Sequence, residues 1–421
     1  MKQIKAVVVG AGNRGKIYAS YSCICGDELK IVGVVDPISE HAADMASEYG
    51  VPKTCVFSSV YEFLKANIRC DLVINATMDS LHYPIDELLL EAGYNVLTEK
   101  PVTPKKAELL RLRDIANEKG VNLFVCHVLR YTPFYKHIKQ DILDGKIGKI
   151  TAIEMSEHVC NVHYVESYVV GKWRSEKECG STFLLAKSCH DTDLMCWLNN
   201  ATEPEEVASF GDRRIFIPEN ASDGHTDTCH TCPCEKTCKY STNRIFFNNP
   251  GWWRDRLSLN VKKPQSEITE EDIQNQVKKS SYGRCVFENK DLLDRQNMIV
   301  KFKNGSIGTF NLIAGSSKGE RYIHIVGEDG EISGALGDNK YVLRRYDFMR
   351  NDFSEEVVDV TVAVENSGHN GGDTALMRDI CAYLRGDRSS ISVTNINDSV
   401  NGHLLVYAAD ESQKQNKIVK L

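Results

Sequence analysis

Residues 6–20 read AVVVGAGNRGKIYAS, and this stretch decides the fold of the first part of the chain. A run of small and β-branched residues ends at a glycine-rich turn, after which the spacing of apolar residues becomes helical. Gly10 permits a sharp exit from the strand, Gly12 lets backbone approach a pyrophosphate, and Gly15 lets the helix lie against the strand. The stretch therefore predicts a strand, a tight turn and a helix whose N-terminal N–H groups bind phosphate.

A second apolar run, 29–35, ends at Asp36, at the distance from the glycine turn that dinucleotide-binding folds use. A carboxylate there accepts hydrogen bonds from an adenosine ribose and repels a 2′-phosphate. The pattern therefore predicts NAD(H) in preference to NADP(H). The alternative is an aspartate that only opens the Asp36-Pro37 turn.

Composition limits the classes of protein that the chain can represent. Its 421 residues are many for one core and suggest two domains. The formal net charge of −7 argues against a generic attraction to nucleic acid or to an anionic membrane. No apolar segment is long enough for a signal-peptide core or a membrane span. We therefore expect a cytosolic protein with no nucleic-acid or membrane partner.

Residues 1–126 alternate short apolar runs with segments of helical spacing. This alternation predicts an α/β domain, a doubly wound parallel sheet of the Rossmann type. Ligands of such sheets bind beyond the carboxyl ends of the strands. The residues at those strand ends should border one crevice, and they are Gly10, Asp36, Asn75, Ala76, Thr77, Glu99, Lys100, Pro101 and His127.

Residues 127–421 contain longer strand-like runs with fewer helices between them. This pattern predicts a C-terminal α+β domain built on a largely antiparallel open sheet. The polar segment 218–282 lacks periodicity and is interpreted as an irregular insertion or lid. Residues 396–414 have helical spacing and are expected to form a surface helix. Open antiparallel sheets commonly associate through an exposed face, so we expect a homo-oligomer.

An ordered set of motifs resembles the Gfo/Idh/MocA oxidoreductases, the relatives of glucose-fructose oxidoreductase and inositol dehydrogenase. The set comprises GAGNRG at 10–15, Asp36, Asn75-Ala76-Thr77 with His82, Glu99-Lys100-Pro101 and Arg130-Tyr131. Three later stretches, 167–174, 185–191 and 368–373, look like a branch of this family that acts on carbohydrates. The resemblance implies a nicotinamide dinucleotide cofactor and a sugar or polyol substrate.

The chemistry of a carbinol adds catalytic candidates, because its oxidation needs a hydride acceptor and a base for the hydroxyl proton. Lys100 is the first, since a partly desolvated lysine near a cationic nicotinamide can relay a proton. His190 is the second, because family members place a histidine there facing the lysine, and its alternative is a structural histidine on a helix. Many relatives carry a carboxylate where this chain has Ala186. Lys187 is a third candidate that could bind substrate, orient His190 or pair with a carboxylate.

The family pattern and the strand-end positions also give two sets of binding candidates. The cofactor set is Gly10, Gly12, Asn13, Arg14, Gly15, Asp36, Asn75, Thr77, His82, Glu99, Lys100 and His127. The substrate set is Tyr131, His163, Tyr168, Trp173, Arg174 and His369, which supply stacking rings and hydrogen-bonding groups of the kinds that hold sugars. Each member of the substrate set could equally be a packing residue.

Four cysteines, Cys229, Cys232, Cys234 and Cys238, lie close together inside the polar insertion. Zinc prefers four thiolate or imidazole ligands and can order a segment that has no core of its own. The spacing predicts one structural zinc that shapes a loop over the substrate cleft, with His225 or His230 as replacements for one thiol. An iron–sulfur cluster or a set of unlinked thiols without metal are the alternatives.

The primary hypothesis is an NAD-dependent oxidoreductase that transfers hydride to or from a hydroxyl-bearing carbon of a sugar, polyol or glycoside. Two alternatives share its residues. One is a redox-neutral glycosidase that oxidises, eliminates, hydrates and reduces with bound NAD. The other is a non-catalytic NAD- or sugar-sensing protein, which would need the fold but no proton relay.

Overall fold

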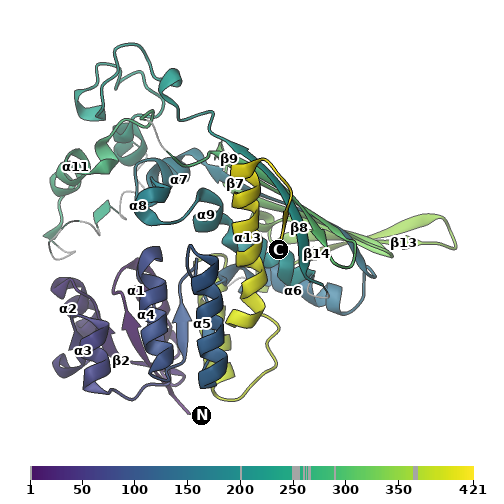
Figure 1. Cartoon of the computed structure of the whole chain (residues 1–421), viewed down its shortest axis with the longest axis horizontal. Helices are drawn as coiled ribbons and strands as arrows, with labels where there is room; N and C mark the ends of the chain where they lie inside the picture. The colour runs from purple at the N-terminus through teal and green to yellow at the C-terminus, as the bar shows by residue number, and fades with distance from the viewer. Residues whose placement is uncertain are drawn as a thin grey trace.

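The computed structural model describes residues 2–199, 202–248, 257–258, 261, 263, 267–288, 291–363 and 368–421. Figure 1 shows an N-terminal part in which strands and helices alternate, and a broad sheet that extends away from it. In the described part of the chain, no helix is both long and apolar enough to cross a membrane.

The N-terminal sheet has six strands in the order β3-β2-β1-β4-β5-β6, and every neighbouring pair is parallel. Its apolar strands are buried on both faces between two hydrophobic clusters. The doubly wound parallel sheet predicted from the sequence is therefore confirmed. Its strands are β1 (Ile4–Val9), β2 (Leu29–Val35), β3 (Val56–Phe57), β4 (Leu72–Asn75), β5 (Val96–Thr98) and β6 (Leu123–Val125). Its helices are α1 (Asn13–Ile24), α2 (Ser39–Glu48), α3 (Val60–Ala66), α4 (Asp79–Glu91) and α5 (Lys106–Lys119).

The second sheet has nine strands in the order β14-β13-β12-β11-β7-β10-β9-β8-β15. Only β7 and β10 pair in parallel among its described strands, so the prediction of a largely antiparallel sheet is confirmed. The strands are β7 (Ile150–Cys160), β8 (Pro204–Asp212), β9 (Arg295–Phe302), β10 (Ile307–Ser316), β11 (Glu320–Gly327), β12 (Gly330–Ala335), β13 (Lys340–Asp347), β14 (Asp352–Asp359) and β15 (Val419–Lys420). Between the sheets and along β7 lie η2 (Val128–Tyr131), α6 (Pro133–Leu143), α7 (Asn161–Tyr164), η3 (Val165–Val169) and α8 (Glu176–Cys179).

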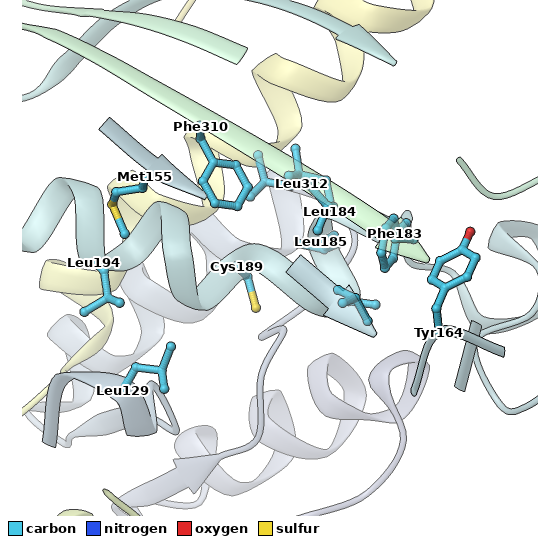
Figure 2. Close-up of a cluster of buried hydrophobic side chains, with 14 of the residues drawn as sticks. Leu129, Met155, Tyr164, Phe183, Leu184, Leu185, Cys189, Leu194, Phe310 and Leu312 are labelled. Atoms are coloured by element: carbon cyan, nitrogen blue, oxygen red, sulfur yellow. The ribbon is translucent and has the colours of Figure 1, made fainter. Parts of the chain in front are cut away.

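Helix α9 (Phe183–Leu198) lies against the second sheet and is buried on nearly all sides. Figure 2 shows Met155 of β7 and Phe310 of β10 on one side of this helix, while its Cys189 and Leu194 point to the other side, where Leu129 lies. A helix that is apolar all round belongs inside a protein, so its few polar side chains need internal partners. Those side chains include His190 and Asp191, which is why this helix matters for the site.

Helix α13 (Ile396–Gln415) lies between the two halves of the molecule and contacts α9, α5 and β8 (Figure 1). The predicted helix is confirmed, but its assignment to the surface is wrong. Ser399, His403 and Ala409 are fully buried, and Gly402 lies so close to Asp193 that an added Cβ would be 2.8 Å from its Cα. Helical spacing predicted the helix but not its surroundings, and polar side chains such as His403 and Ser412 make hydrogen bonds inside the protein.

Helix α12 (Gly372–Leu384) returns from the C-terminal part to the parallel sheet. Its Leu376, Met377 and Ile380 join the cluster that contains Tyr18 of α1. Residues from near the end of the chain therefore complete the core of its beginning. The division into residues 1–126 and 127–421 stays a prediction.

The predicted insertion at 218–282 contains little regular structure in its described residues. These include η4 (Pro218–Asn220), η5 (Cys229–Thr231), η6 (Arg244–Asn248), η8 (Ser281–Gly283) and one regular helix, α11 (Glu270–Lys279). Thr269 and Asp272 form a capping box at the start of α11, a local signal that the sequence interpretation overlooked. Residues 249–256, among others of this segment, lie outside the described residues.

Candidate active site

The glycine turn has the geometry that its sequence predicts. Gly10 has a φ of +92°, and a Cβ added at Gly15 would lie 2.1 Å from the Gly10 carbonyl oxygen. A Cβ added at Gly12 would meet no described atom within 4 Å, so the turn faces open space there. Gly12 precedes α1, and no described side chain caps this helix. The uncapped helix N-terminus and the open space fit a dinucleotide pyrophosphate.

Asp36 lies directly beside this turn. Its Oδ2 accepts a hydrogen bond from the Ala11 N–H at 2.7 Å, and its Oδ1 accepts one from the Ile38 N–H at 2.8 Å. The carboxylate therefore holds the glycine turn and the following turn together. Each carboxylate oxygen keeps a second lone pair, so hydrogen bonds from a ribose remain compatible with these contacts.

Asn75, Thr77 and His82 support the ends of β4 and β5. The Asn75 side chain donates to Asp86 at 2.7 Å and accepts from the Thr77 hydroxyl at 2.7 Å. The ring nitrogens of His82 lie 2.7 Å from the Pro101 carbonyl oxygen and 3.1 Å from that of Thr77. These predicted cofactor residues thus fix the backbone at the crevice edge, while their side chains are engaged within the protein.

Arg14 joins the cofactor turn to the end of the chain. Its guanidinium contacts Glu99 at 2.6 Å, Asp373 at 2.7 Å and the Tyr18 hydroxyl. Burial opposes ionisation of Glu99, but Arg14, Lys100 and Tyr18 outweigh it and lower the pKa of that carboxyl. Arg14 is therefore held by the protein itself. His369 extends the chain of contacts, since its Nδ1 lies 3.0 Å from Asp373.

Lys100, which follows β5, reaches α9 near His190. The Lys100 Nζ donates to the Ala186 carbonyl oxygen at 2.9 Å, one helical turn before His190 on α9. The backbone of Ala186 therefore orients the lysine at the position where many relatives carry a carboxylate. Two of the three ammonium donors of Lys100 stay available for a ligand.

His190 is the first of three buried histidines, His190, His127 and His403, whose rings are in contact one after another. Its ring is edge-on to His127 at 5.6 Å, and His127 is 5.5 Å from His403. The Nδ1 of His190 has no hydrogen-bond partner among the described residues. Burial lowers the pKa of His190 well below its usual value, and positively charged Lys100 adds to the effect. The imidazole is therefore neutral near pH 7 and can accept a proton.

His127 supports His190 from behind. Its Nε2 lies 2.8 Å from the Ser399 hydroxyl, and its side chain is fully buried. Burial lowers the pKa of His127 well below its usual value, with a further contribution from His403. This predicted cofactor residue thus lies behind the catalytic candidate, in the interior.

Lys187 belongs to a buried group of four charges. Its Nζ is 3.0 Å from Glu157, and Arg321 Nε is 2.7 Å from Glu157 and 2.8 Å from Asp191. Burial lowers the pKa of Lys187 despite the opposing charge of Glu157. The sequence left three roles open for Lys187: binding substrate, orienting His190 or pairing with a carboxylate. In the structure Lys187 pairs with the carboxylate of Glu157.

The structure brings together three of the six predicted substrate residues. His163 and Tyr168 have ring centroids 6.1 Å apart, and Tyr168 and Trp173 are 5.9 Å apart. The Trp173 Nε1 donates to Asp79 of α4 at 3.0 Å, which ties this aromatic row to the parallel-sheet domain. The row thus bridges the two halves near the strand ends.

The other three predicted substrate residues lie apart from that row or are already engaged. The Tyr131 hydroxyl accepts from the Thr394 N–H at 3.2 Å inside the core, which indicates a packing role. Arg174 donates to Ser281 at 3.4 Å and pairs with Glu178. His369 is partly exposed at the far end of the Arg14 network.

The predicted four-cysteine zinc site is not preformed. Among the described residues, no group of three or more histidine, cysteine, aspartate or glutamate side chains is arranged to hold a metal ion. Cys234 Sγ instead contacts the Asp223 carbonyl oxygen at 3.3 Å, and Cys229 Sγ lies 3.8 Å from that of Arg284. The four-residue ligand set is corrected accordingly, because two of its thiols contact backbone carbonyl oxygens.

Several residues that build this site were missed from the sequence. They come from distant parts of the chain: Tyr18, Glu157, Asp191, Arg321, Asp373, Ser399 and His403. Asp191 and Asp373 stand inside motifs that were quoted, so a signal existed for them. Glu157, Arg321 and His403 had none, since their partners are distant in sequence.

Comparison with known families agrees with this geometry. Residues 4–127 match the family model described as an oxidoreductase family with an NAD-binding Rossmann fold, and residues 139–421 match the C-terminal alpha/beta domain of that family. The chain therefore belongs to the Gfo/Idh/MocA family of NAD-binding oxidoreductases.

Individual relatives match at low identity. The oxidoreductase YteT of Bacillus subtilis, so named from comparison, is 24% identical to this chain. The match covers 74% of this chain and 72% of YteT. The scyllo-inositol 2-dehydrogenase (NAD(+)) of the same organism is 31% identical over 35% of this chain and 42% of that protein. The WlbA dehydrogenase from Bordetella pertussis, solved with NADH and UDP-GlcNAcA, has a TM-score of 0.70 at 17% identity. That comparison covers 100% of this chain and 98% of the other, and it concerns the fold.

Proposed function

We propose that this protein oxidises a hydroxyl-bearing carbon of a sugar, polyol or glycoside with NAD, or reduces the corresponding carbonyl with NADH, and that Lys100 and His190 transfer the proton. The observation that carries the proposal is the approach of Lys100 to α9 one turn before His190. Two groups able to exchange protons thus flank the strand ends where the glycine turn and Asp36 fit a dinucleotide.

Each residue would have a separate task. Bound NAD would supply the hydride acceptor or donor. Lys100 would hold the reacting hydroxyl through its spare ammonium donors, and neutral His190 would accept its proton at a ring nitrogen. His127 acts as a positioning residue, because its ring lies edge-on against His190 and is itself held by the hydroxyl of Ser399.

The substrate class is supported by two observations. The row of His163, Tyr168 and Trp173 supplies aromatic faces and polar tips of the type that hold sugar rings. The names of relatives also point to sugars and polyols, among them scyllo-inositol 2-dehydrogenase and the 1,5-anhydro-D-fructose reductase of Ensifer adhaerens.

The decisive test is a panel of sugars, polyols and glycosides with NAD(H), using wild type and Lys100→Ala. We expect NADH formation or consumption with at least one compound, and a loss of kcat of about 10²- to 10⁴-fold in the variant, the range for acid–base groups. NAD affinity should change little. The matched control is Lys105→Ala, which removes an exposed lysine paired with Glu108 on the same segment. Turnover that survives in Lys100→Ala would contradict the role of this lysine.

The same panel separates the two alternatives. Cleavage of a glycoside without net NADH would favour the redox-neutral glycosidase. NAD binding without turnover of any compound would favour the sensing protein. Both outcomes would overturn the proposed net oxidation or reduction.

We also infer a homo-oligomer from the outward face of the nine-stranded sheet. Phe210, Ile299, Ile313 and Tyr322 are exposed on β8, β9, β10 and β11, and strand register places them on one face. Large exposed apolar side chains that gather on one face are typical of a subunit interface, although polar residues such as Asn297 and Glu154 share this face. The molar mass in solution, measured by light scattering, should exceed 47.3 kDa. A monomer would contradict this inference.

A further inference from the structure

Four cysteines of the insertion and Cys285, which follows it, surround one small cavity. Cys229, Cys232, Cys234 and Cys238 line it together with Cys285, which follows Cys238 only after a long intervening segment. The cavity has a volume of about 20 Å³. A space of this size holds about one water molecule or one ion.

Backbone contacts fix Cys285 beside the other four thiols. Thr228 and Arg284 form an antiparallel bridge, and the Cys285 N–H donates to the Asp227 carbonyl oxygen at 2.8 Å. The residue after Thr228 is Cys229, so the bridge brings two cysteines from distant parts of the sequence next to each other. This placement depends on the backbone and not on a ligand.

The cavity has the chemistry of a soft metal site. All five thiols are free, and Phe287 and Val286 close the walls between them. Clustered thiols of this kind lose their protons when a divalent cation joins them, because the cation stabilises the thiolates.

We propose that Cys229, Cys232, Cys238 and Cys285 bind one zinc ion, and that Cys234 stands outside the ligand set. Four thiolates in tetrahedral geometry are a common structural zinc site. Cys234 is only two residues from Cys232, which is tight for two ligands of one tetrahedral ion, and its Sγ contact with the Asp223 carbonyl oxygen, 3.3 Å, is shorter than the 3.8 Å between Cys229 Sγ and the Arg284 carbonyl oxygen. Since the thiols line the cavity without being arranged as ligands, rotation of cysteine side chains toward the centre accompanies binding.

The zinc site stabilises the segment around Ser281, which lies beside the row of His163, Tyr168 and Trp173. Tyr240 next to the cavity has its ring 5.0 Å from Phe216 and 5.8 Å from Phe287, which connects the cavity to the core of the second sheet. Ser281, just before Cys285, accepts a hydrogen bond from Arg174, the neighbour of Trp173. Loss of the metal therefore loosens the segment beside the aromatic row and leaves the glycine turn unchanged.

The test is metal analysis of the purified full-length protein. We expect about one zinc per chain, the stoichiometry of one four-ligand site. Cys285→Ser should lose the metal, whereas the matched control Cys234→Ser should keep it. NADH binding by fluorescence shows in each variant that the parallel-sheet domain is folded. After removal of zinc with a chelator, added Co²⁺ should produce the visible absorption of tetrahedral cobalt thiolates in wild type and in Cys234→Ser only.

Three results would overturn the proposal. A metal-free protein whose five thiols all react with a thiol reagent would show unlinked cysteines. A mass loss of two protons that disappears on reduction would show a disulfide. Retention of zinc in Cys285→Ser with its loss in Cys234→Ser would assign the site to the four clustered cysteines alone. None of these readouts depends on the substrate or on turnover.

Discussion

The parallel-sheet domain and the cysteine-rich insertion reach order in different ways. In the first, β1, β4 and β5 are buried on both faces, and apolar clusters hold every layer. In the described residues of the second, η5 and the following turns surround a cavity lined by thiols, and the ten-residue helix α11 begins with a capping box.

Because the two regions are ordered in different ways, a substitution should have different effects on stability and binding in each of them. Apolar burial spreads stability over many residues, each worth about 1.5–3 kcal/mol for a large side chain. A segment held by a few converging side chains depends on each of them. Changes in the parallel-sheet domain should therefore affect folding and NAD binding, and changes in the insertion should affect the substrate side.

The largest effect that we expect is a pH dependence of the unfolding free energy that comes from buried His403 and has no counterpart at exposed histidines of the insertion. Its Nε2 accepts from the Val102 N–H at 3.1 Å, and burial lowers the pKa of His403 to about 4. The unfolded chain, with a pKa near 6.5, then binds more protons between these two values. The stability that neutral His403 contributes is present above about pH 6.5 and is lost as the pH falls toward 4.

Urea unfolding of wild type and His403→Gln at pH 7 and pH 4 measures this contribution. Glutamine keeps an acceptor for the Val102 N–H but cannot be protonated. The difference in unfolding free energy between wild type and variant should shift by about 3 kcal/mol against wild type at pH 4. The control is His230→Gln, which changes an exposed histidine of the insertion. Parallel pH dependences for wild type and His403→Gln would rule out this linkage.

A smaller effect separates folding from cofactor binding within the glycine turn. Gly15→Ala places a Cβ against the Gly10 carbonyl oxygen and should cost about 1–3 kcal/mol of stability by overpacking. Gly12→Ala meets no described atom within 4 Å, and its φ of −78° suits any residue. It should leave stability unchanged but weaken NADH binding about tenfold, or about 1.4 kcal/mol, by filling the space for the pyrophosphate.

Denaturant unfolding and NADH fluorescence titration of both variants give the two readouts. If Gly12→Ala binds NADH as tightly as wild type, the pyrophosphate lies elsewhere and the cofactor placement is wrong.

The smallest expected effect lies at the junction with the insertion. Ser281→Ala removes the acceptor of the Arg174 hydrogen bond at 3.4 Å. We expect a rise in KM of about two- to fivefold, or about 0.5–1 kcal/mol, with an unchanged NADH affinity. Ser280→Ala is the control, because its hydroxyl contacts only the Val277 carbonyl oxygen among the described residues. Weaker NADH binding in Ser281→Ala would show that the two regions are coupled more strongly than we infer.

What the sequence predicts correctly here depends on local pattern. The turn at Gly10 to Gly15, the position of Asp36 and the strands of both sheets follow from spacing within a few tens of residues. The contacts of Arg14 with Asp373 and of Arg321 with Glu157 do not, because they join elements that are distant in sequence. Cys285 escaped notice for the same reason.

One prediction from spacing was wrong in part. The helical spacing at 396–414 predicted α13 but not its burial, because side chains such as His403 and Ser412 make hydrogen bonds inside the protein. Polar residues indicate a surface only when no internal partner exists, and one chain without its contacts cannot show such partners.

Because α12 completes the core of the parallel-sheet domain, this domain cannot finish folding until nearly the whole chain has been synthesised. The six strands of the parallel sheet leave the ribosome early, but Leu376, Met377 and Ile380, which cover the cluster around Tyr18, come near the end of the chain. At a synthesis rate of about 5–20 residues per second, this apolar surface stays exposed for tens of seconds before α12 is synthesised. The nascent domain is therefore a natural client for chaperones, and slowing translation after residue 126 should lower the yield of folded protein.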